Sequence, residues 1–254
     1  MASPKGETER GYTESRRRGS FSLVPWHDDV TPPALIIFDC DGVLVDSEPI
    51  SIAVLLDVLA SAGHVMSEET AYELFLGRSM ATTIELLRND FGFVVTAEHL
   101  EQARTALYER FRRELKPIPG IRNALRQLAL PRCIASSSQP ERIRFSLGVT
   151  GLLPFFEPHI YSAAMVRRGK PAPDLFLHAA REMGVEPEEC LVVEDSPAGI
   201  MAAKEADMRV FGFTGGSHAH AGGLARNLAP LEPDAIFDDM RRLPSLIAAL
   251  GKAR

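Results

Sequence analysis

The sequence has few cysteines, no long apolar run and no excess of positive charge. Its three cysteines, Cys40, Cys133 and Cys190, are far apart and at no spacing typical of metal ligands. This argues against a disulfide framework and predicts free, mostly buried thiols in a reducing cytoplasm. Because no stretch is both long and apolar enough to cross a bilayer, we expect no membrane partner.

The charge balance is acidic. A net charge of −6 and a pI of about 5.7 give no general attraction for nucleic acid or an anionic membrane. An anionic substrate must therefore be bound at a local site. The chain of 254 residues, 45% apolar and 24% charged, is long enough to bury one core with a smaller additional unit.

Residues 1–32 differ in composition from the rest of the chain. They contain few apolar residues and mix arginines with glutamates, so we expect a flexible N-terminal tail. A transit peptide is the alternative, and Glu7, Glu9 and Glu14 count against it.

Short apolar runs alternate with helical patterns through most of the chain. Continuous rather than alternating apolar runs predict strands that are buried on both faces, and helices between them predict a parallel sheet. The predicted strands cover 34–38, 132–136, 190–193, 209–213 and 235–237, and the predicted helices cover 121–130, 140–147, 173–183 and 196–206. The fold class is therefore α/β, with a Rossmann-like core.

Residues 48–116 break this alternation. Successive helical patterns without a strand predict an inserted, all-helical cap domain. The core is then formed by residues 33–47 and 117–254, with hinges expected near 45–47 and 117–120. Residues 214–230 are expected to form a long loop. His218 and His220 lie in it near a strand end, and we expect them to be solvated, with an approach to the site as the alternative.

Two pairs of acids follow predicted strands. Asp39 and Asp41 follow the first, with Gly42 able to turn the chain, and Glu194 and Asp195 follow the strand at 190–193. Ligands of open parallel sheets bind at the carboxyl ends of strands, and oxygen ligands of this kind suit Mg²⁺. Each pair alone is also compatible with a solvated strand end or a favourable helix start.

A lysine and a run of serines complete the pattern. Lys170 lies between a glycine and a proline before a predicted helix, and its ammonium could neutralise carboxylates and a phosphate. Ser136, Ser137 and Ser138 follow a strand and precede a helix, which suits either an anion pocket or a simple helix cap.

In combination, these segments resemble the haloacid dehalogenase superfamily. The segment Phe-Asp-Cys-Asp-Gly-Val-Leu-Val-Asp-Ser is similar to its first motif, and Ser136, Lys170 and Glu194-Asp195 correspond to the other three. The helical insert resembles the cap of the subgroup with sugar-phosphate, 6-phosphogluconate and phosphoglycolate phosphatases. The resemblance to β-phosphoglucomutase is weaker, because Ser51 stands where that enzyme has a histidine.

The resemblance implies a magnesium-dependent phosphatase that acts on a small phosphorylated metabolite. Asp39 would be the nucleophile and Asp41 the acid/base, while Ser136, Ser137 and Lys170 would bind the phosphate. Mg²⁺ would be held by Asp39, the Asp41 backbone carbonyl and Asp195, with Glu194 nearby or bound through water.

Other features of the function stay open at this point. Arg78, in the predicted cap loop, either reads a substrate hydroxyl or carboxylate or is a solvated arginine. A phosphosugar mutase and a non-catalytic metabolite sensor on the same fold are the alternative functions. We expect a cytoplasmic monomer or weak homodimer.

Overall fold

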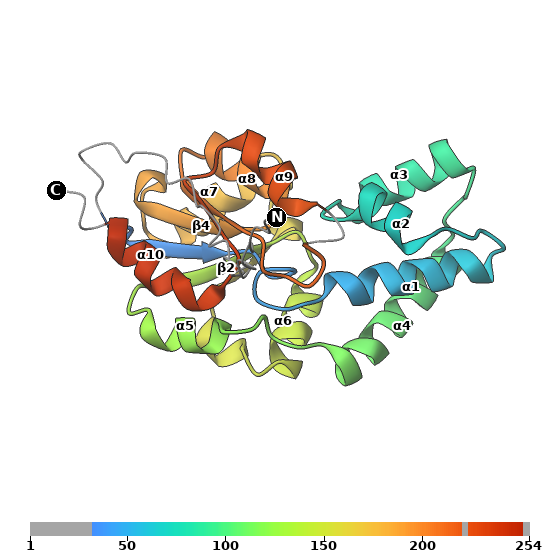
Figure 1. Ribbon diagram of the computed structural model, residues 1–254, viewed down its shortest axis with the longest axis horizontal. Coiled ribbons are helices and arrows are strands. Elements are labelled where there is room, and N and C mark those ends of the chain that lie inside the picture. The colour runs from blue at the N-terminus through green and yellow to red at the C-terminus, as the bar shows by residue number, and fades with distance from the viewer. Residues whose placement is uncertain (1–31, 220–222, 251–254) are drawn as a thin grey trace, which may run out of the picture.

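The computed structural model describes residues 32–219 and 223–250. The predicted tail therefore lies outside the described residues except for its last position, and so does His220. A six-stranded parallel sheet in the order β3-β2-β1-β4-β5-β6 forms the centre of the molecule (Figure 1). The strands are β1 Leu35–Phe38, β2 Arg132–Ser136, β3 Ile160–Ser162, β4 Cys190–Glu194, β5 Arg209–Phe213 and β6 Ala235–Phe237.

Helices cover both faces of the sheet, as the continuous apolar strands predict. Ile36 and Phe38 of β1 pack into one apolar cluster, and Leu35 and Ile37 pack into the other. The first face is covered by α5 Ile121–Gln127, α6 Pro140–Val149 and α10 Leu243–Leu250, and the second by α7 Asp174–Met183, α8 Pro197–Glu205 and α9 Leu224–Leu228. The α/β, Rossmann-like prediction is confirmed.

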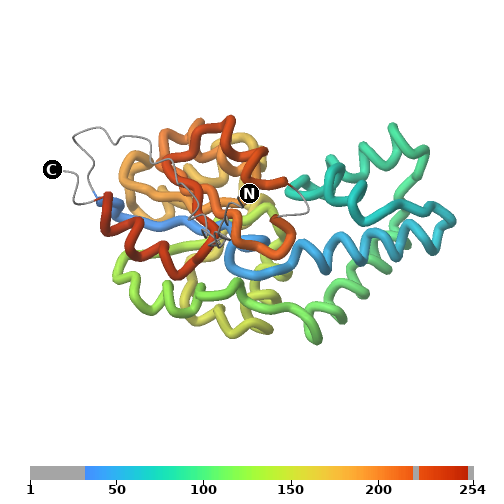
Figure 2. The backbone as a smooth tube through the Cα atoms, in the orientation of Figure 1, coloured from blue at the N-terminus to red at the C-terminus, as the bar shows by residue number. Residues whose placement is uncertain are grey.

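Four helices lie between β1 and β2 in the chain. They are α1 Glu48–Ser61, α2 Glu68–Phe75, α3 Met80–Phe91 and α4 Ala97–Glu114. The first three contribute to an apolar cluster of their own that includes Leu59, Phe75 and Phe93, whereas Phe111 of α4 belongs to the cluster on the first face of the sheet. Figures 1 and 2 place these helices beyond the carboxyl ends of the strands, with α1 and α4 side by side. That they act as a separate cap domain stays a prediction.

The two passages between the sheet and these helices run next to each other. Val45 bridges to Asp41 on one side and to Pro117 on the other, and the Asp46 amide donates to the Lys116 carbonyl at 3.0 Å. The start of the helical segment is therefore tied to the same turn that carries Asp41.

Two sequence predictions are corrected by the structure. The edge strand β3 was missed because its three residues, Ile-Tyr-Ser, do not form a continuous apolar run, whereas the equally short edge strand β6, Ala-Ile-Phe, does. The predicted loop over 214–230 contains α9, whose Leu224 and Leu228 are buried against the second face of the sheet. Packing, rather than helix propensity, accounts for this short helix.

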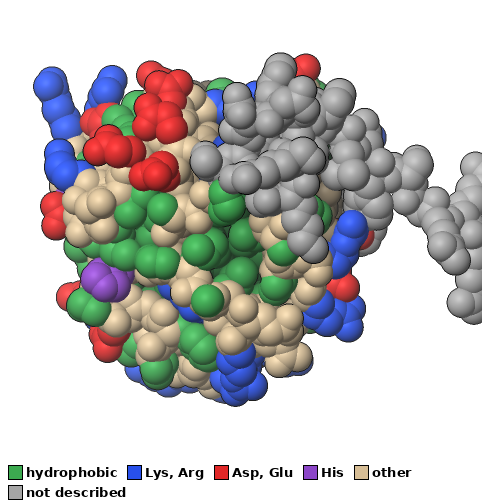
Figure 3. All heavy atoms as spheres, turned by 90° about the vertical axis from the view of Figure 1, so that its left-hand side faces the viewer, with side chains coloured by type: hydrophobic (Ala, Val, Ile, Leu, Met, Phe, Trp, Pro, Cys, Tyr) green, Lys and Arg blue, Asp and Glu red, His purple; other side chains and the backbone are tan. Residues whose placement is uncertain are grey.

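The exterior agrees with the mixed composition. Figure 3 shows the face turned away from α1 to α4, where acidic and basic side chains lie around a central area of hydrophobic ones. Within the described residues, none of the helices has both the length and the apolar character to span a bilayer. The three cysteines are buried and free.

Candidate active site

Asp39 stands at the carboxyl end of β1 as an extension of the strand. Its amide donates to the Val193 carbonyl of β4 at 3.0 Å, which fixes its backbone, and its side chain is buried. Gly42 then turns the chain with a φ of 77°, a conformation that glycine adopts without strain. The strand and this turn place Asp39 at the edge of the sheet that faces the helical segment.

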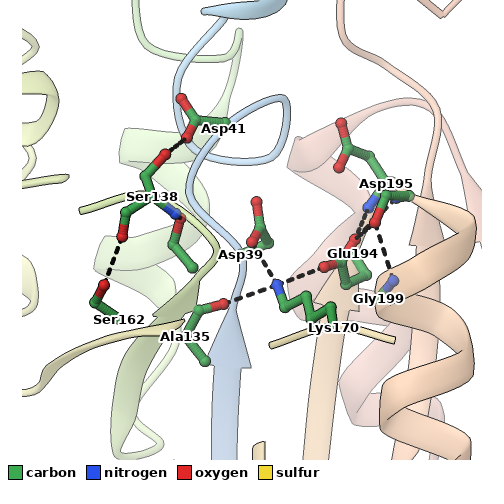
Figure 4. A network of polar contacts seen from close by, with 11 residues as sticks. Asp39, Asp41, Ala135, Ser138, Ser162, Lys170, Glu194, Asp195 and Gly199 are labelled. Atoms are coloured by element: carbon green, nitrogen blue, oxygen red, sulfur yellow. Dashed lines mark hydrogen bonds and ion pairs between the residues drawn. The ribbon is translucent and has the colours of Figure 1, made fainter. Parts of the chain in front are cut away.

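Lys170 reaches Asp39 from the loop before α7. Its Nζ lies 2.6 Å from Asp39 Oδ1 and 2.6 Å from Glu194 Oε1, and it donates to the Ala135 carbonyl at 2.9 Å (Figure 4). Only 3% of its side chain is exposed. Burial acts to lower the pKa of Lys170, but Asp39 and Glu194 outweigh it and raise the pKa above its ordinary value. Lys170 is therefore a buried, charged ammonium.

Glu194 anchors this lysine. Its Oε2 accepts from the amides of Asp195 and Ser196 at 2.9 and 2.8 Å and from the Ser196 hydroxyl at 3.0 Å. The same hydroxyl caps α8 by accepting from the Gly199 amide at 3.0 Å. Both oxygens of Glu194 are thus engaged by protein donors, which fixes the carboxylate.

Asp41 is turned away from Asp39 (Figure 4). The hydroxyls of Ser47 and Ser138 donate to its two oxygens at 2.6 Å each, and Arg142 pairs with it at 3.0 Å. Burial acts to raise the pKa of Asp41, but Arg142 and the two hydroxyls outweigh it and hold the pKa below its usual value. Asp41 is therefore ionised in this state.

Arg142 was missed in the sequence. It lies in the first turn of α6, where an arginine has no pattern to distinguish it from a solvated one. In the structure its guanidinium also lies 3.4 Å from the Ser51 hydroxyl of α1 and 5.5 Å from the centre of the Phe111 ring of α4. One side chain of the core thus contacts Asp41 and two helices of the inserted segment.

The three serines at the end of β2 and directly after it have different environments. Ser136 is buried, and its hydroxyl accepts from the Ser138 amide at 3.1 Å. Ser137 is exposed, and Ser138 is fixed by its bond to Asp41 and by the Ser162 hydroxyl, which donates to its carbonyl. The sequence did not single out Ser138 from its neighbours, yet its hydroxyl contacts Asp41 directly.

The prediction that His218 is solvated was wrong. It is 1% exposed, and its Nε2 lies 3.3 Å from Asp195 Oδ2. Burial lowers the pKa of His218, although Glu48 and Asp46 act in the opposite direction. The Gly-rich composition of its loop concealed this position, because it suggested exposure rather than close packing.

The loop with Arg78 reaches the same region. A Cβ on Gly77 would lie 3.4 Å from the Ser196 side chain, so the helical segment approaches the start of α8 here. Arg78 itself is exposed. At the start of α1, burial together with Asp41 and Asp195 raises the pKa of Glu48 to about 7.

The charges at the centre of the site do not balance. Three carboxylates (Asp39, Glu194 and Asp195) and one ammonium (Lys170) leave two negative charges. Burial and the neighbouring carboxylates raise the pKa values of Asp39 and Asp195 well above normal, although Lys170 lowers both. A divalent cation would supply the missing charge.

The oxygen donors present suit such a cation. In the described part of the chain, no group of three Asp, Glu, His or Cys side chains is arranged to hold a metal by itself. The expected set needs only two carboxylates, those of Asp39 and Asp195, because a backbone carbonyl and water complete it. Carboxylate, carbonyl and water oxygens are the ligands that Mg²⁺ prefers.

Comparisons with known proteins give one consistent result. A family model described as haloacid dehalogenase-like hydrolase matches residues 33–207. The 6-phosphogluconate phosphatase of Escherichia coli (strain K12) is 32% identical over 220 residues, which cover 85% of this chain and 95% of that protein.

Two solved structures are also similar. A haloacid dehalogenase-like protein of unknown function from Agrobacterium tumefaciens is 41% identical, with a TM-score of 0.76, covering 86% of this chain and 99% of that one. A hydrolase of the same family from Deinococcus radiodurans, with bound phosphate and sodium, is 31% identical, with a TM-score of 0.72 and coverage of 88% and 98%.

Replacement of Gly199 by alanine tests the packing around Glu194. Although alanine favours helices, a Cβ at this position would lie 1.9 Å from the Glu194 carboxyl group. The displaced carboxylate would lose its contact with Lys170. We therefore expect Gly199→Ala to lower the free energy of unfolding in urea by about 2 kcal/mol or more.

The matched control is Gly148→Ala in α6, where a Cβ has no neighbour within 4 Å. This substitution should raise the free energy of unfolding by about 0.5–1 kcal/mol. Equal effects of the two substitutions would contradict the packing described for Glu194.

Proposed function

The chain belongs to the haloacid dehalogenase-like hydrolases, and from this membership we propose that it is a magnesium-dependent phosphatase acting through an aspartyl-phosphate on Asp39. The observation that carries the proposal is the buried Lys170 between Asp39 and Glu194, next to the unbalanced charge of Asp195. The phosphatase name of the Escherichia coli relative and the phosphate bound in the Deinococcus structure support it.

Asp39 is the nucleophile. Lys170 holds its Oδ1 and is itself fixed by Glu194, so the carboxylate is oriented before substrate arrives. Attack on phosphorus forms an Asp39–phosphorus bond and breaks the bond to the ester oxygen, which leaves as an alcohol after taking a proton. Water then attacks the phosphorus, releasing inorganic phosphate and the free carboxylate.

Asp41 transfers a proton in both steps. It gives a proton to the leaving oxygen and then takes one from the attacking water. Because Ser138 and Arg142 hold it ionised and turned from Asp39, it must leave these partners and become protonated before the first step. The structure described therefore corresponds to a state in which the acid is withdrawn.

Lys170 and the end of β2 bind the phosphate. Lys170 contributes a fixed positive charge, and Ser136 and Ser137 lie where the strand ends and α6 begins. Positioned charges and donors of this kind provide most of the catalysis in phosphoryl transfer.

Asp39, Asp195 and the Asp41 carbonyl are the proposed magnesium ligands. Bound Mg²⁺ would allow the anionic nucleophile and the phosphate to approach each other. Because protein donors engage both oxygens of Glu194, we assign this residue to holding Lys170 rather than to the direct ligands.

The substrate class is a small polar phosphate ester: a sugar phosphate, a sugar-acid phosphate or phosphoglycolate. Arg78 and Glu48 come from the helical segment to the side of the site where the non-phosphate part of a substrate would lie. A guanidinium donates hydrogen bonds to hydroxyl or carboxylate oxygens, and a carboxyl group pairs with a hydroxyl. A screen of phosphorylated metabolites with Mg²⁺, read as released phosphate, identifies the substrate.

The screen also separates hydrolysis from the alternatives. We expect phosphate release rather than interconversion of glucose 1-phosphate and glucose 6-phosphate. Robust interconversion of the two glucose phosphates would show that the protein is a mutase and not a phosphatase. A protein that hydrolyses none of the esters would instead be a candidate metabolite sensor.

Asp39→Asn is expected to lower magnesium-dependent hydrolysis of an aryl phosphate by about 10³-fold or more, because the nucleophile is lost. The rate of phosphate release measures this. Asp90→Asn, at an exposed position of α3, is the control and should leave the rate unchanged. Full activity of Asp39→Asn would rule out the proposed nucleophile.

The effect of Asp41→Asn on the rate of phosphoenzyme formation is expected to depend on the leaving group of the ester. Loss of a general acid costs about 10²- to 10⁴-fold for an alkyl phosphate, whose alkoxide needs a proton. An aryl phosphate with an acidic phenol needs little protonation, so its phosphoenzyme formation should fall much less. Rapid-quench measurement of the phosphoenzyme with both esters tests this, and equal losses would argue against the acid role.

A further inference from the structure

His218 is buried next to the proposed magnesium ligand Asp195 and has no part in the mechanism above. Its Nε2 lies 3.3 Å from Asp195 Oδ2. Its Nδ1 is buried without a hydrogen-bond partner among the described residues. Among the described residues, the contact with Asp195 is the polar contact given for this imidazole. A buried nitrogen without a partner is unfavourable.

Two glycines make room for this contact. A Cβ on Gly42 would lie 1.8 Å from Asp195 Oδ2 and 3.1 Å from His218 Cε1. A Cβ on Gly216 would lie 2.4 Å from His218 Cε1. The imidazole and the carboxylate thus fill space that any side chain at these positions would occupy, and packing fixes their relative orientation.

The loop that carries His218 is attached to the turn after β1. The amide and hydroxyl of Ser217 both donate to Asp46 Oδ1, at 3.1 and 2.9 Å. The Ala219 amide donates to the Gly216 carbonyl at 3.0 Å, and the loop begins with a bond from the Thr214 amide to the Phe237 carbonyl. These hydrogen bonds fix the backbone on either side of His218.

We propose that His218 is a positioning residue for the magnesium centre: it holds Oδ2 of Asp195 so that the carboxylate is presented to the cation. A carboxylate at a strand end can rotate about two side-chain bonds, and a metal site needs it in one orientation. Partners behind the ligands supply that restraint, and losing one lowers metal affinity by about 10- to 100-fold.

The inference rests on the magnesium requirement of the proposed function, so its test measures metal binding rather than turnover. The unfolding temperature of the full chain is followed as a function of Mg²⁺ concentration, which gives an apparent affinity because ligand binding stabilises the native state. The same scan in EDTA shows whether each variant folds.

Three substitutions at one position separate polarity from packing. His218→Leu keeps the bulk and removes the polar contact, and we expect it to weaken Mg²⁺ binding by about 10-fold or more. His218→Gln carries an amide nitrogen close to the position of Nε2 and should restore most of the affinity. His218→Asn carries its amide near the position of Nδ1 and should not. His159→Leu, at an exposed position, is the control and should bind Mg²⁺ like the wild type.

The outcomes are decisive in each direction. Unchanged affinity in His218→Leu, or equal affinities of the Gln and Asn variants, would overturn the role of His218. If His218→Leu does not fold in EDTA, the comparison of Gln with Asn still decides. A wild-type protein that Mg²⁺ does not stabilise would overturn the magnesium centre itself, and with it the proposed function.

Discussion

The site depends on the burial of one ammonium group between two carboxylates. Lys170 is almost completely enclosed, with Asp39 on one side and Glu194 on the other. None of these groups is stable there alone, since an uncompensated charge in a buried position is strongly unfavourable. The order of the sheet makes the arrangement possible, because β1 lies between β2 and β4 and the ends of all three meet at one edge.

The remaining negative charge has a consequence for the chemistry. Lys170 neutralises only part of the charge of three carboxylates, so the protein alone leaves Asp39 in a poor environment for an anion. In the proposed mechanism the nucleophile must be ionised, and its ionisation is thus coupled to the binding of a cation. The proposed magnesium requirement then follows from the charges of the site as well as from the approach of phosphate.

Sequence reasoning was most successful where a residue follows a recognisable strand. Continuous apolar runs located five of the six strands, and the missed β3 has the mixed sequence Ile-Tyr-Ser instead of such a run. Asp39 and Asp195 could be singled out because acids at the ends of buried strands are costly unless used, and Lys170 because it completes the pattern of the family's motifs. Arg142 and His218 could not, since an arginine in a helix and a histidine in a Gly-rich loop are ordinarily solvated. The role of Arg142 follows from its contact with Asp41, which is 101 residues away in the chain. The position of His218 follows from the hydrogen bond that ties its loop to Asp46.

Arg142 gives a physical route by which the helical segment influences the chemistry of the core. Its guanidinium is in contact with Asp41, with Ser51 of α1 and with the ring of Phe111 in α4. A displacement of α1 or α4 that removes Ser51 and Phe111 from the arginine changes the surroundings of the ion pair that keeps Asp41 withdrawn. Because the same chain turn carries Asp41 and begins the passage into α1, the position of the helices and the orientation of the acid are linked through both backbone and side chain. In the proposed mechanism, substrate that binds against these helices would therefore act directly on Asp41, without a separate change in the sheet.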